Sequence, residues 1–361
     1  MKIANNVKSY SVKILDESIE INGRQFAQTA IVILRDQNHN MIQKQKMGIV
    51  DNEELYKKIA QKIPVDLSYC YVKNFSIQKL RQQENIIDNA SIVLTDFNAE
   101  NAFFESDKVT DFSNIHFEGE VTNFKNAHFG LGNLTFAKSH FKTSIIDFSY
   151  TSYSEGDTNF SFCKFTQPKG RLTFENANFI SGTISFVSVH FDNDQISFKN
   201  AQFGQSNLSM KFSIFTKGLL LFDKTTFKGE EVDFSKVNFN RIRVDFKRTN
   251  FSNANLIFDE SASVGEKFIF IKCTFLHNQI SFKSADLGQS EIVFDESQFG
   301  GGNISFLSLT AHKLSLNNCS LSINVDASTL LPLTTPLCAI GVAIAIPSAQ
   351  LWPGVPGILE G

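Results

Sequence analysis

Residues 196–207, ISFKNAQFGQSN, form one unit of a repeated spacing from which the fold can be predicted. The two phenylalanines of this unit, Phe198 and Phe203, are five residues apart, and seven residues lead on to the next equivalent position. From Phe112 to Phe306 the chain keeps this alternation of five and seven and so repeats every twelve residues. Two residues before each Phe stands an aliphatic or small residue, with a polar one between them. That alternation predicts short strands with one buried face.

The phenylalanines of this ladder are the predicted core. Composition agrees, because the 361 residues include 37 Phe but only six Tyr and one Trp. The core residues singled out from the central units are Phe174, Phe179, Phe186, Phe191, Phe198, Phe203, Phe222, Phe227, Phe234, Phe239, Phe246 and Phe251. Substitutes are expected to fill the same positions at Tyr153, Met210, Ser263, Leu287 and Ala311.

The size of one coil follows from packing. A coil of twelve residues would have to enclose two Phe and two further inward residues, which a loop of that size cannot hold. A coil of twenty-four residues has four sides of five, seven, five and seven, so residues n and n+24 stack at about 4.8 Å. About eight coils from Phe112 to Phe306 then make a rod on the order of 40 Å long. The nine residues from Phe165 to Phe174 predict a two-residue bulge at one corner.

The longer segments must turn a corner, and glycines fall in them. A positive φ is expected at these positions because glycine adopts it without steric cost. The glycines are Gly119, Gly132, Gly156, Gly182, Gly218, Gly229 and Gly265.

Residues 1–64 lack the ladder and predict a small α+β unit. Segments 10–21 and 29–35 are expected to be strands of a hairpin, with Asn22-Gly23 as a turn. Asp51 or Asn52 is the expected N-cap of a helix over residues 53–63, which Pro64 follows. Such a unit is expected to cap the open end of a repeat stack. The first residues lack the apolar core of a signal peptide, so a cytoplasmic location is predicted.

From residue 65 to 104 the chain becomes five-periodic, as in Val65-Asp66-Leu67-Ser68-Tyr69 and Cys70-Tyr71-Val72-Lys73-Asn74. These blocks resemble the pentapeptide-repeat family. The resemblance implies an all-β, right-handed, four-sided parallel β-solenoid. The twelve-residue repeats of residues 105–325 are a five-and-seven variant of that pattern.

Residues 326–361 differ from the rest of the chain, with five of its seven prolines and no Phe. Their apolar run 337–346 is too short to span a bilayer. Three interpretations remain open: a hydrophobic cap, an anchor for a membrane or partner through residues 330–358, or a foreign or disordered tail.

Four cysteines are predicted to be small core residues, because each stands two positions before a large inward side chain. They are Cys70, Cys163, Cys273 and Cys319; Cys338 falls in the tail. A buried thiol in apolar surroundings is inert, so no catalytic cysteine is expected.

The histidines show a second pattern. His116, His128, His140 and His190 all precede an inward Phe and should point outward. His116 and His140 are twenty-four residues apart, so they should stack, and they are the only candidates for metal binding. A metal needs three or four ligands, and no carboxylate joins them in sequence. A solvated polar face is therefore preferred, and no metal or cofactor is predicted.

Two further patterns concern the surface. Hydroxyl residues recur between inward pairs at Thr135, Thr173, Ser185, Ser197, Ser209, Ser281 and Ser305. Asp and aliphatic residues interrupt these rows, which argues against ice binding and for ordinary solvent-facing strands. Arg241, Arg243, Lys247 and Arg248 form a local basic cluster, interpreted as a charged side face.

Composition excludes several function classes. The net charge is −3, and the segment from Asp111 to Ala311 has 21 acidic and 19 basic residues. Neither a nucleic-acid-binding surface nor the negative surface of the DNA-mimicking, gyrase-protecting pentapeptide-repeat proteins is therefore indicated. The leading hypothesis is a non-enzymatic scaffold that binds an unidentified protein, with end-to-end stacking into oligomers possible. The first alternative is a rigid spacer or sensor region of a longer protein whose C-terminal effector part is absent. The second, which the near-neutral charge disfavours, is a DNA mimic that binds a topoisomerase.

Overall fold

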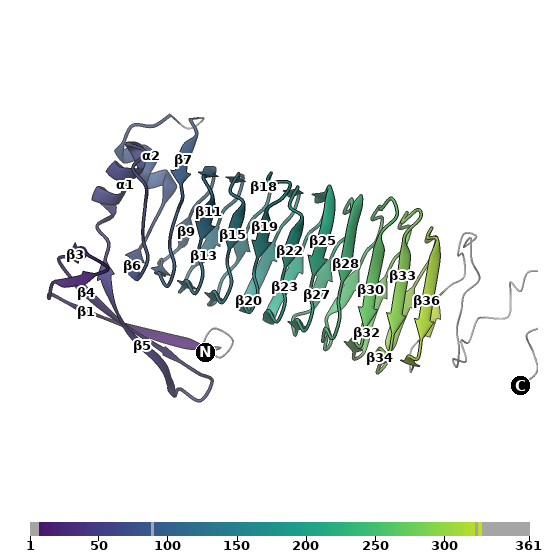
Figure 1. Cartoon of the computed structure of the whole chain (residues 1–361). Coiled ribbons are helices and arrows are strands. Elements are labelled where there is room, and N and C mark those ends of the chain that lie inside the picture. Colours follow the sequence, from purple (N-terminus) through teal and green to yellow (C-terminus); the bar gives the residue numbers. More distant parts are fainter. Residues whose placement is uncertain (1–6, 88–89, 322–323, 327–361) are drawn as a thin grey trace, which may run out of the picture.

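The computed structural model describes residues 7–87, 90–321 and 324–326, and it is a rod of stacked β-coils with a small α+β region at one end (Figure 1). Each coil has four short sides, most of them strands, and every coil pairs in parallel with the next, in places through isolated β-bridges such as that of Asn238 with Ala262. Phe117 pairs with Phe141 and Val232 with Leu256, each twenty-four residues on. The predicted four-sided parallel solenoid and its coil length are confirmed.

The side strands form four walls. The nine-stranded wall contains β11 (Val121–Asn123), β15 (Ile145–Asp147), β19 (Arg171–Thr173), β22 (Gln195–Ser197), β25 (Lys217–Leu221), β28 (Arg241–Asp245), β30 (Lys267–Ile271), β33 (Glu291–Asp295) and β36 (Lys313–Asn317). The six-stranded wall contains β7 (Ile92–Thr95), β10 (Ile115–Glu118), β14 (His140–Phe141), β18 (Lys164–Phe165), β21 (His190–Phe191) and β24 (Ile214–Phe215).

The other two walls share strands that bend through a corner. The long wall contains β9 (Val109–Asp111), β13 (Asn133–Thr135), β17 (Thr158–Asn159), β20 (Asn178–Ser185), β23 (Gln202–Ser209), β27 (Glu231–Asp233), β29 (Asn255–Ile257), β32 (Asn278–Ser281), β35 (Gly302–Ser305) and β38 (Asn324–Asp326). The covered wall contains β6 (Cys70–Lys73), β8 (Phe103–Glu105), β12 (His128–Phe129), β16 (Ser152–Tyr153), the first residues of β20 and β23, β26 (Thr226–Phe227), β31 (Thr274–Phe275), β34 (Gln298–Phe299) and β37 (Ser320–Leu321).

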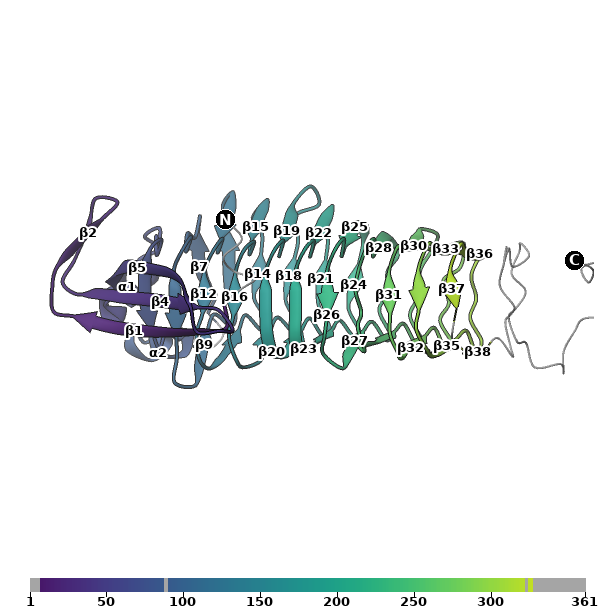
Figure 2. The same cartoon turned by 90° about the horizontal axis from the view of Figure 1, so that it is seen from below.

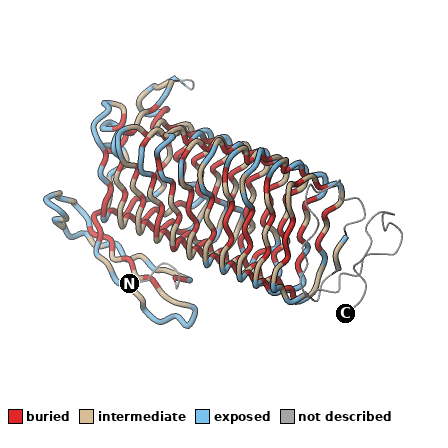
Figure 3. Tube along the Cα trace, turned by 45° about the vertical axis from the view of Figure 1, so that its right-hand side comes forward, coloured by how far each residue is buried: buried red, intermediate tan, exposed pale blue. Residues whose placement is uncertain are grey.

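Buried residues recur on every coil of the rod (Figure 3), and in the interior their aromatic rings stack from coil to coil. Every core Phe named above is at most 1% exposed, and the five predicted substitutes are buried as well. Phe198 stacks on Phe174 and Phe222 of the neighbouring coils, with ring centroids 4.9 and 5.1 Å apart. The predicted bulge is also present, because Ile146 pairs with Leu172, twenty-six residues on.

The N-terminal region differs in part from the prediction. β1 (Ser9–Leu15) pairs antiparallel with β4 (Thr29–Arg35), but Asn22-Gly23 closes a separate hairpin of β2 (Ile19–Ile21) and β3 (Arg24–Phe26). A strand that was not predicted, β5 (Met41–Ile49), completes a three-stranded sheet and pairs in parallel with β6. We call β1, β4 and β5 the N-terminal sheet.

Two helices close the first coil. α1 (Asn52–Ala60) begins at the predicted N-cap Asp51, whose side chain accepts from the backbone N–H of Glu53, but it ends before Ile63. α2 (Ile77–Gln83) was not predicted, because its first residues continue the five-residue pattern. Ser76 caps α2 by accepting from the N–H of Lys79. Both helices bury apolar residues against the solenoid core, as a cap would.

The corners turn in two ways. Six of the seven predicted glycines have positive φ; Gly229 does not. At Gly182 a side chain would also collide with the neighbouring coil, because an added Cβ would lie 2.1 Å from the carbonyl oxygen of Gly156. The other two corners of each coil were missed by sequence reasoning: there the residue two positions after a core Phe has positive φ and is never Gly in the twelve-residue repeats.

These left-handed residues line two opposite edges of the rod. The first edge, between the long and six-stranded walls, contains Asn114, Lys138, Phe162, Ser188, Phe212, Lys236, Glu260, Ser284 and Ser308. The second edge, between the nine-stranded and covered walls, contains Asn126, Tyr150, Asn176, Asn200, Lys224, Arg248, Lys272, Glu296 and Asn318. Left-handed backbone suits Asn and disfavours bulky side chains.

We expect Phe198→Asp to unfold the coils around it, because an unpaired carboxylate in this interior costs about 3–5 kcal/mol. The control Asn200→Asp adds the same charge on the second edge and should leave the thermal unfolding midpoint almost unchanged. Equal midpoints for the two variants would contradict the inward assignment of Phe198.

We expect Phe162→Asn to stabilise the rod by about 1 kcal/mol, because Asn tolerates the left-handed φ of 62° that Phe162 adopts. Urea unfolding of the two proteins measures the difference. A loss of stability would mean that contacts of the Phe162 ring outweigh its backbone strain.

Candidate functional site

The histidine column lies on the six-stranded wall as the spacing predicts. His116 pairs with His140, and the column continues through Lys164 to His190. The rings of His116 and His140 meet edge to face, with centroids 5.5 Å apart. Stacking of these two candidates is therefore confirmed.

The surroundings of the pair do not complete a metal site. Nε2 of His140 lies 2.6 Å from Oγ1 of Thr166, and Nζ of Lys142 lies 2.8 Å from Oε1 of Glu118. Burial, with Lys142 nearby, lowers the pKa of His140 to about 4. Among the residues that the structure describes, no group of three His, Cys, Asp or Glu is arranged to hold a metal.

His128 is the exception to the expected solvated polar face. It points away from the core, but the N-terminal sheet covers it, so it is only 8% exposed. Its Nδ1 lies 2.5 Å from Oγ of Ser152 in the next coil. Burial lowers the pKa of His128 to about 4, so the ring is neutral in the folded protein at neutral pH.

Hydrogen bonds among one carboxylate and two phenol hydroxyls join the N-terminal sheet to the covered wall. We call the contacts of Glu105, Tyr71 and Tyr10 the clasp. Glu105 accepts from the hydroxyl of Tyr71 and, at 3.1 Å, from that of Tyr10. The N–H of Leu131 donates to the Tyr10 hydroxyl at 2.9 Å. Gly130 permits this approach, because an added Cβ would lie 2.7 Å from the same oxygen. Burial, together with Glu105, raises the pKa of Tyr10 to about 12.

Beside this clasp is a cavity of about 520 Å³ between β1 and the covered wall. The Tyr10, Tyr71 and Glu105 side chains line it, and so do Leu131 and Ile180. Tyr10, Tyr71 and Glu105 are hydrogen-bonded to one another, so this part of the lining has a structural role.

The cysteines are core residues, as predicted for Cys70, Cys163 and Cys273, which are each 1% exposed. Cys319 is only partly buried, and Cys338 lies outside the described residues. Burial raises the pKa of the Cys70 thiol to about 11 and of the Cys273 thiol to about 12. Neither thiol is ionised at neutral pH, which removes the form that attacks electrophiles.

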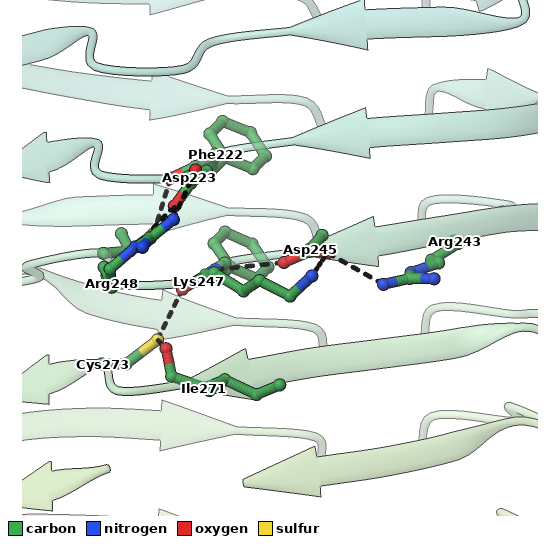
Figure 4. Close-up of polar contacts among 10 residues, drawn as sticks. Phe222, Asp223, Arg243, Asp245, Lys247, Arg248, Ile271 and Cys273 are labelled. Carbon is green, nitrogen blue, oxygen red and sulfur yellow. Dashed lines mark hydrogen bonds and ion pairs between the residues drawn. The ribbon is translucent and has the colours of Figure 1, made fainter. Parts of the chain in front are cut away.

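Three of the four cations of the basic cluster are paired with carboxylates (Figure 4). Buried Asp245 lies 3.1 Å from both Arg243 and Lys247. Arg248 reaches across one coil to Asp223 at 3.0 Å. The cluster therefore forms a charged side face, as interpreted from the sequence, in which two carboxylates balance half of the positive charge.

The hydroxyl rows divide between two walls. Ser185, Ser209, Ser281, Ser305 and Thr135 lie on the long wall, whereas Thr173 and Ser197 lie on the nine-stranded wall. The division and the intervening Asp and aliphatic residues leave no single continuous hydroxyl face in the described chain.

The feature that sequence reasoning missed is a pair of aromatic side chains on the first edge. Phe162 and Phe212 are 56% and 53% exposed, in backbone that disfavours bulky residues. Ile214, beside Phe212, is 43% exposed. The sequence did contain a sign of these residues. Each stands two residues after a core position, where the spacing of the repeat does not place an inward Phe.

No protein-family model matches the chain, and no curated protein or solved structure is significantly similar to it. Neither described helix has the length and apolar character needed to cross a bilayer.

Because His128 is buried, we expect the stability of the protein to depend on pH. Its pKa is about 4 in the folded state and about 6.5 when unfolded, so below pH 6.5 the unfolded chain binds the proton first. Stability is therefore complete above pH 6.5 and falls toward pH 4, by about 2–3 kcal/mol from this residue. Unfolding free energies of the wild type and His128→Gln should converge or cross as pH falls. If the unfolding free energies of the two proteins changed equally with pH, protonation of His128 would carry no free-energy penalty in the folded state, which would contradict the prediction.

Proposed function

We propose that the chain is a non-enzymatic protein-interaction scaffold of the pentapeptide-repeat type, and that a protein partner docks on its first edge. The observation that carries this proposal is the exposure of Phe162 and Phe212 in left-handed backbone. A bulky residue there costs about 1–2 kcal/mol, and its exposed ring contributes little to the core. A binding role accounts for both features.

The two exposed rings lie two coils apart on the same edge of the rod. Phe162, Ser188 and Phe212 lie on consecutive coils. The backbone N–H of each donates a hydrogen bond to the next coil along the chain. Two coils correspond to about 10 Å along the rod. Exposed aromatic side chains of this kind are typical binding hot spots when they enter pockets of a partner.

The charged residues around the two rings indicate the charge expected on the partner's surface. Lys138 and Lys164 flank Phe162, and neither has a carboxylate partner among the described residues. Nζ of Lys236 lies 5.6 Å from the centre of the Phe212 ring. A surface with apolar pockets and a carboxylate rim would fit this edge.

The remaining chemistry supports a scaffold more than an enzyme or a DNA mimic. The buried thiols have raised pKa values, and the His pair has a threonine hydroxyl and a lysine as its neighbours. Ion pairs such as Lys236–Glu260 and Lys267–Glu291 run between coils and balance charge along the rod. A DNA mimic would need a marked negative excess.

A photo-crosslinking amino acid tests the proposed edge. Benzoylphenylalanine would replace Phe162 or Phe212 in the full chain, and Tyr150 as the matched aromatic position on the second edge. We expect the same protein to be captured from both first-edge positions and not from Tyr150.

Once the partner is identified, its affinity for variants of the chain shows whether the exposed rings contribute to binding. We expect Phe162→Asn/Phe212→Asn to lower affinity at least tenfold, as for hot-spot residues, while Tyr150→Asn leaves it unchanged. No specific adduct at the first edge, or equal affinity for all three proteins, would contradict the proposal and favour a passive spacer.

A further inference from the structure

The outward face of the N-terminal sheet has a composition that the clasp does not explain. Cross-strand pairing aligns three rows on this face: Lys13–Ile31–Lys46, Ser11–Ile33–Lys44 and Ser9–Arg35–Met41. We call these nine residues the basic face. It contains four cations, three aliphatic side chains and two serines, with no carboxylate, although the whole chain has a net charge of −3.

The basic face is free to meet a partner. The opposite face of the sheet buries Ala30, Val32, Leu34 and Met47 against Tyr71 and Phe103 of the covered wall. The basic face therefore points away from the rod, and β1 and β4 lie in front of the coils in Figure 2. Lys13, Lys44, Lys46 and Met41 are exposed, and Met41 is 59% exposed.

The cations of this face are held apart from acids. No ion pair joins Lys13, Lys44 or Lys46 to a carboxylate in the described part of the chain, and Arg35 donates to the backbone oxygen of His39. The nearest acid at the sheet's tip, Asp36, accepts from the N–H groups of Asn38 and Asn40. The basic face thus keeps four positive charges available for an external anion.

We propose that the basic face docks on the surface of an anionic lipid bilayer. Lysines at a membrane surface bind anionic headgroups, while short aliphatic side chains reach the headgroup boundary. On the central strand, Ile31 lies between Lys13 and Lys46, and Ile33 lies beside Lys44. Met41 stands at the free tip. The three rows share one face of the sheet, so they can approach a membrane surface together.

Other partners fit this face less well. It has no aromatic ring on which a nucleotide base could stack, and no side-chain amide that could read a base edge. Protein interfaces favour aromatic residues and Arg and are poor in Lys, whereas three of these four cations are Lys and no aromatic is present. The lipid surface is the partner that uses both the lysines and the aliphatic residues.

Vesicle sedimentation with the full chain tests the proposal. The probes are vesicles of phosphatidylcholine alone and of phosphatidylcholine mixed with phosphatidylserine. We expect binding only to the mixed vesicles, weakening as salt is raised. Each cation near the surface contributes about fivefold, so Lys13→Gln/Lys44→Gln/Lys46→Gln should lower the partition coefficient by roughly a hundredfold.

The control Lys169→Gln/Lys224→Gln/Lys283→Gln removes the same charge from exposed positions on the rod. It should bind mixed vesicles like the wild type, and both triple variants should keep the wild-type melting temperature. Residues 327–361 are identical in all these proteins, so any contribution from them cancels. Met41→Ser should reduce the binding that remains at high salt.

Three outcomes would overturn the proposal: equal binding to both kinds of vesicle, equal loss in the two triple variants, or no vesicle binding together with salt-sensitive binding to duplex DNA. These results are independent of the partner on the first edge, because the vesicle assay contains no other protein.

Discussion

The contact on which the structure depends is the stacking of one phenylalanine on the equivalent phenylalanine of the next coil. Along the core, successive rings lie nearly parallel at the spacing of hydrogen-bonded strands, as between Phe148 and Phe174, 4.9 Å apart at 7°. Each ring is buried, which stabilises it by about 1.5–3 kcal/mol, and each aromatic pair adds about 0.5–1.5 kcal/mol. The same register satisfies the backbone, because every coil donates to the next. A shift of one residue would turn the rings outward, so packing and hydrogen bonding select one register together.

Because the interior is fixed in this way, the outer surfaces can differ from coil to coil. The nine-stranded wall holds ion pairs around Asp245, the six-stranded wall holds the histidine column, and the first edge holds two exposed phenylalanines. The N-terminal sheet extends this division. It packs one apolar face on the covered wall and turns a lysine-rich face to the exterior. Both proposed binding surfaces are therefore outside the repeating core and can change without disturbing it.

The twelve-residue spacing was enough to predict the core, the coil length and the stacking of His116 on His140, because a strict in-and-out alternation leaves few ways to pack. It could not predict contacts between segments distant in the chain. His128 has the same local pattern as His140, and only the arrival of the N-terminal sheet makes it buried. α2 was missed because Ile77 also fits the five-residue pattern, and its Ser76 cap decides for a helix. The exposed Phe162 and Phe212 were hidden among the many core phenylalanines, since composition does not distinguish a ring inside from a ring at a corner.

In this fold, residues twenty-four apart are neighbours and residues twelve apart lie on different walls. Cysteine pairs test this directly, with cross-linked peptides identified by mass spectrometry after mild oxidation. Ser185 pairs with Ser209 on the long wall, while Thr173 lies on the nine-stranded wall. Ser185→Cys/Ser209→Cys should form a disulfide, because strand neighbours are about 4.8 Å apart. Thr173→Cys/Ser185→Cys should remain reduced. Rapid disulfide formation by the second pair and none by the first would contradict the twenty-four-residue coil.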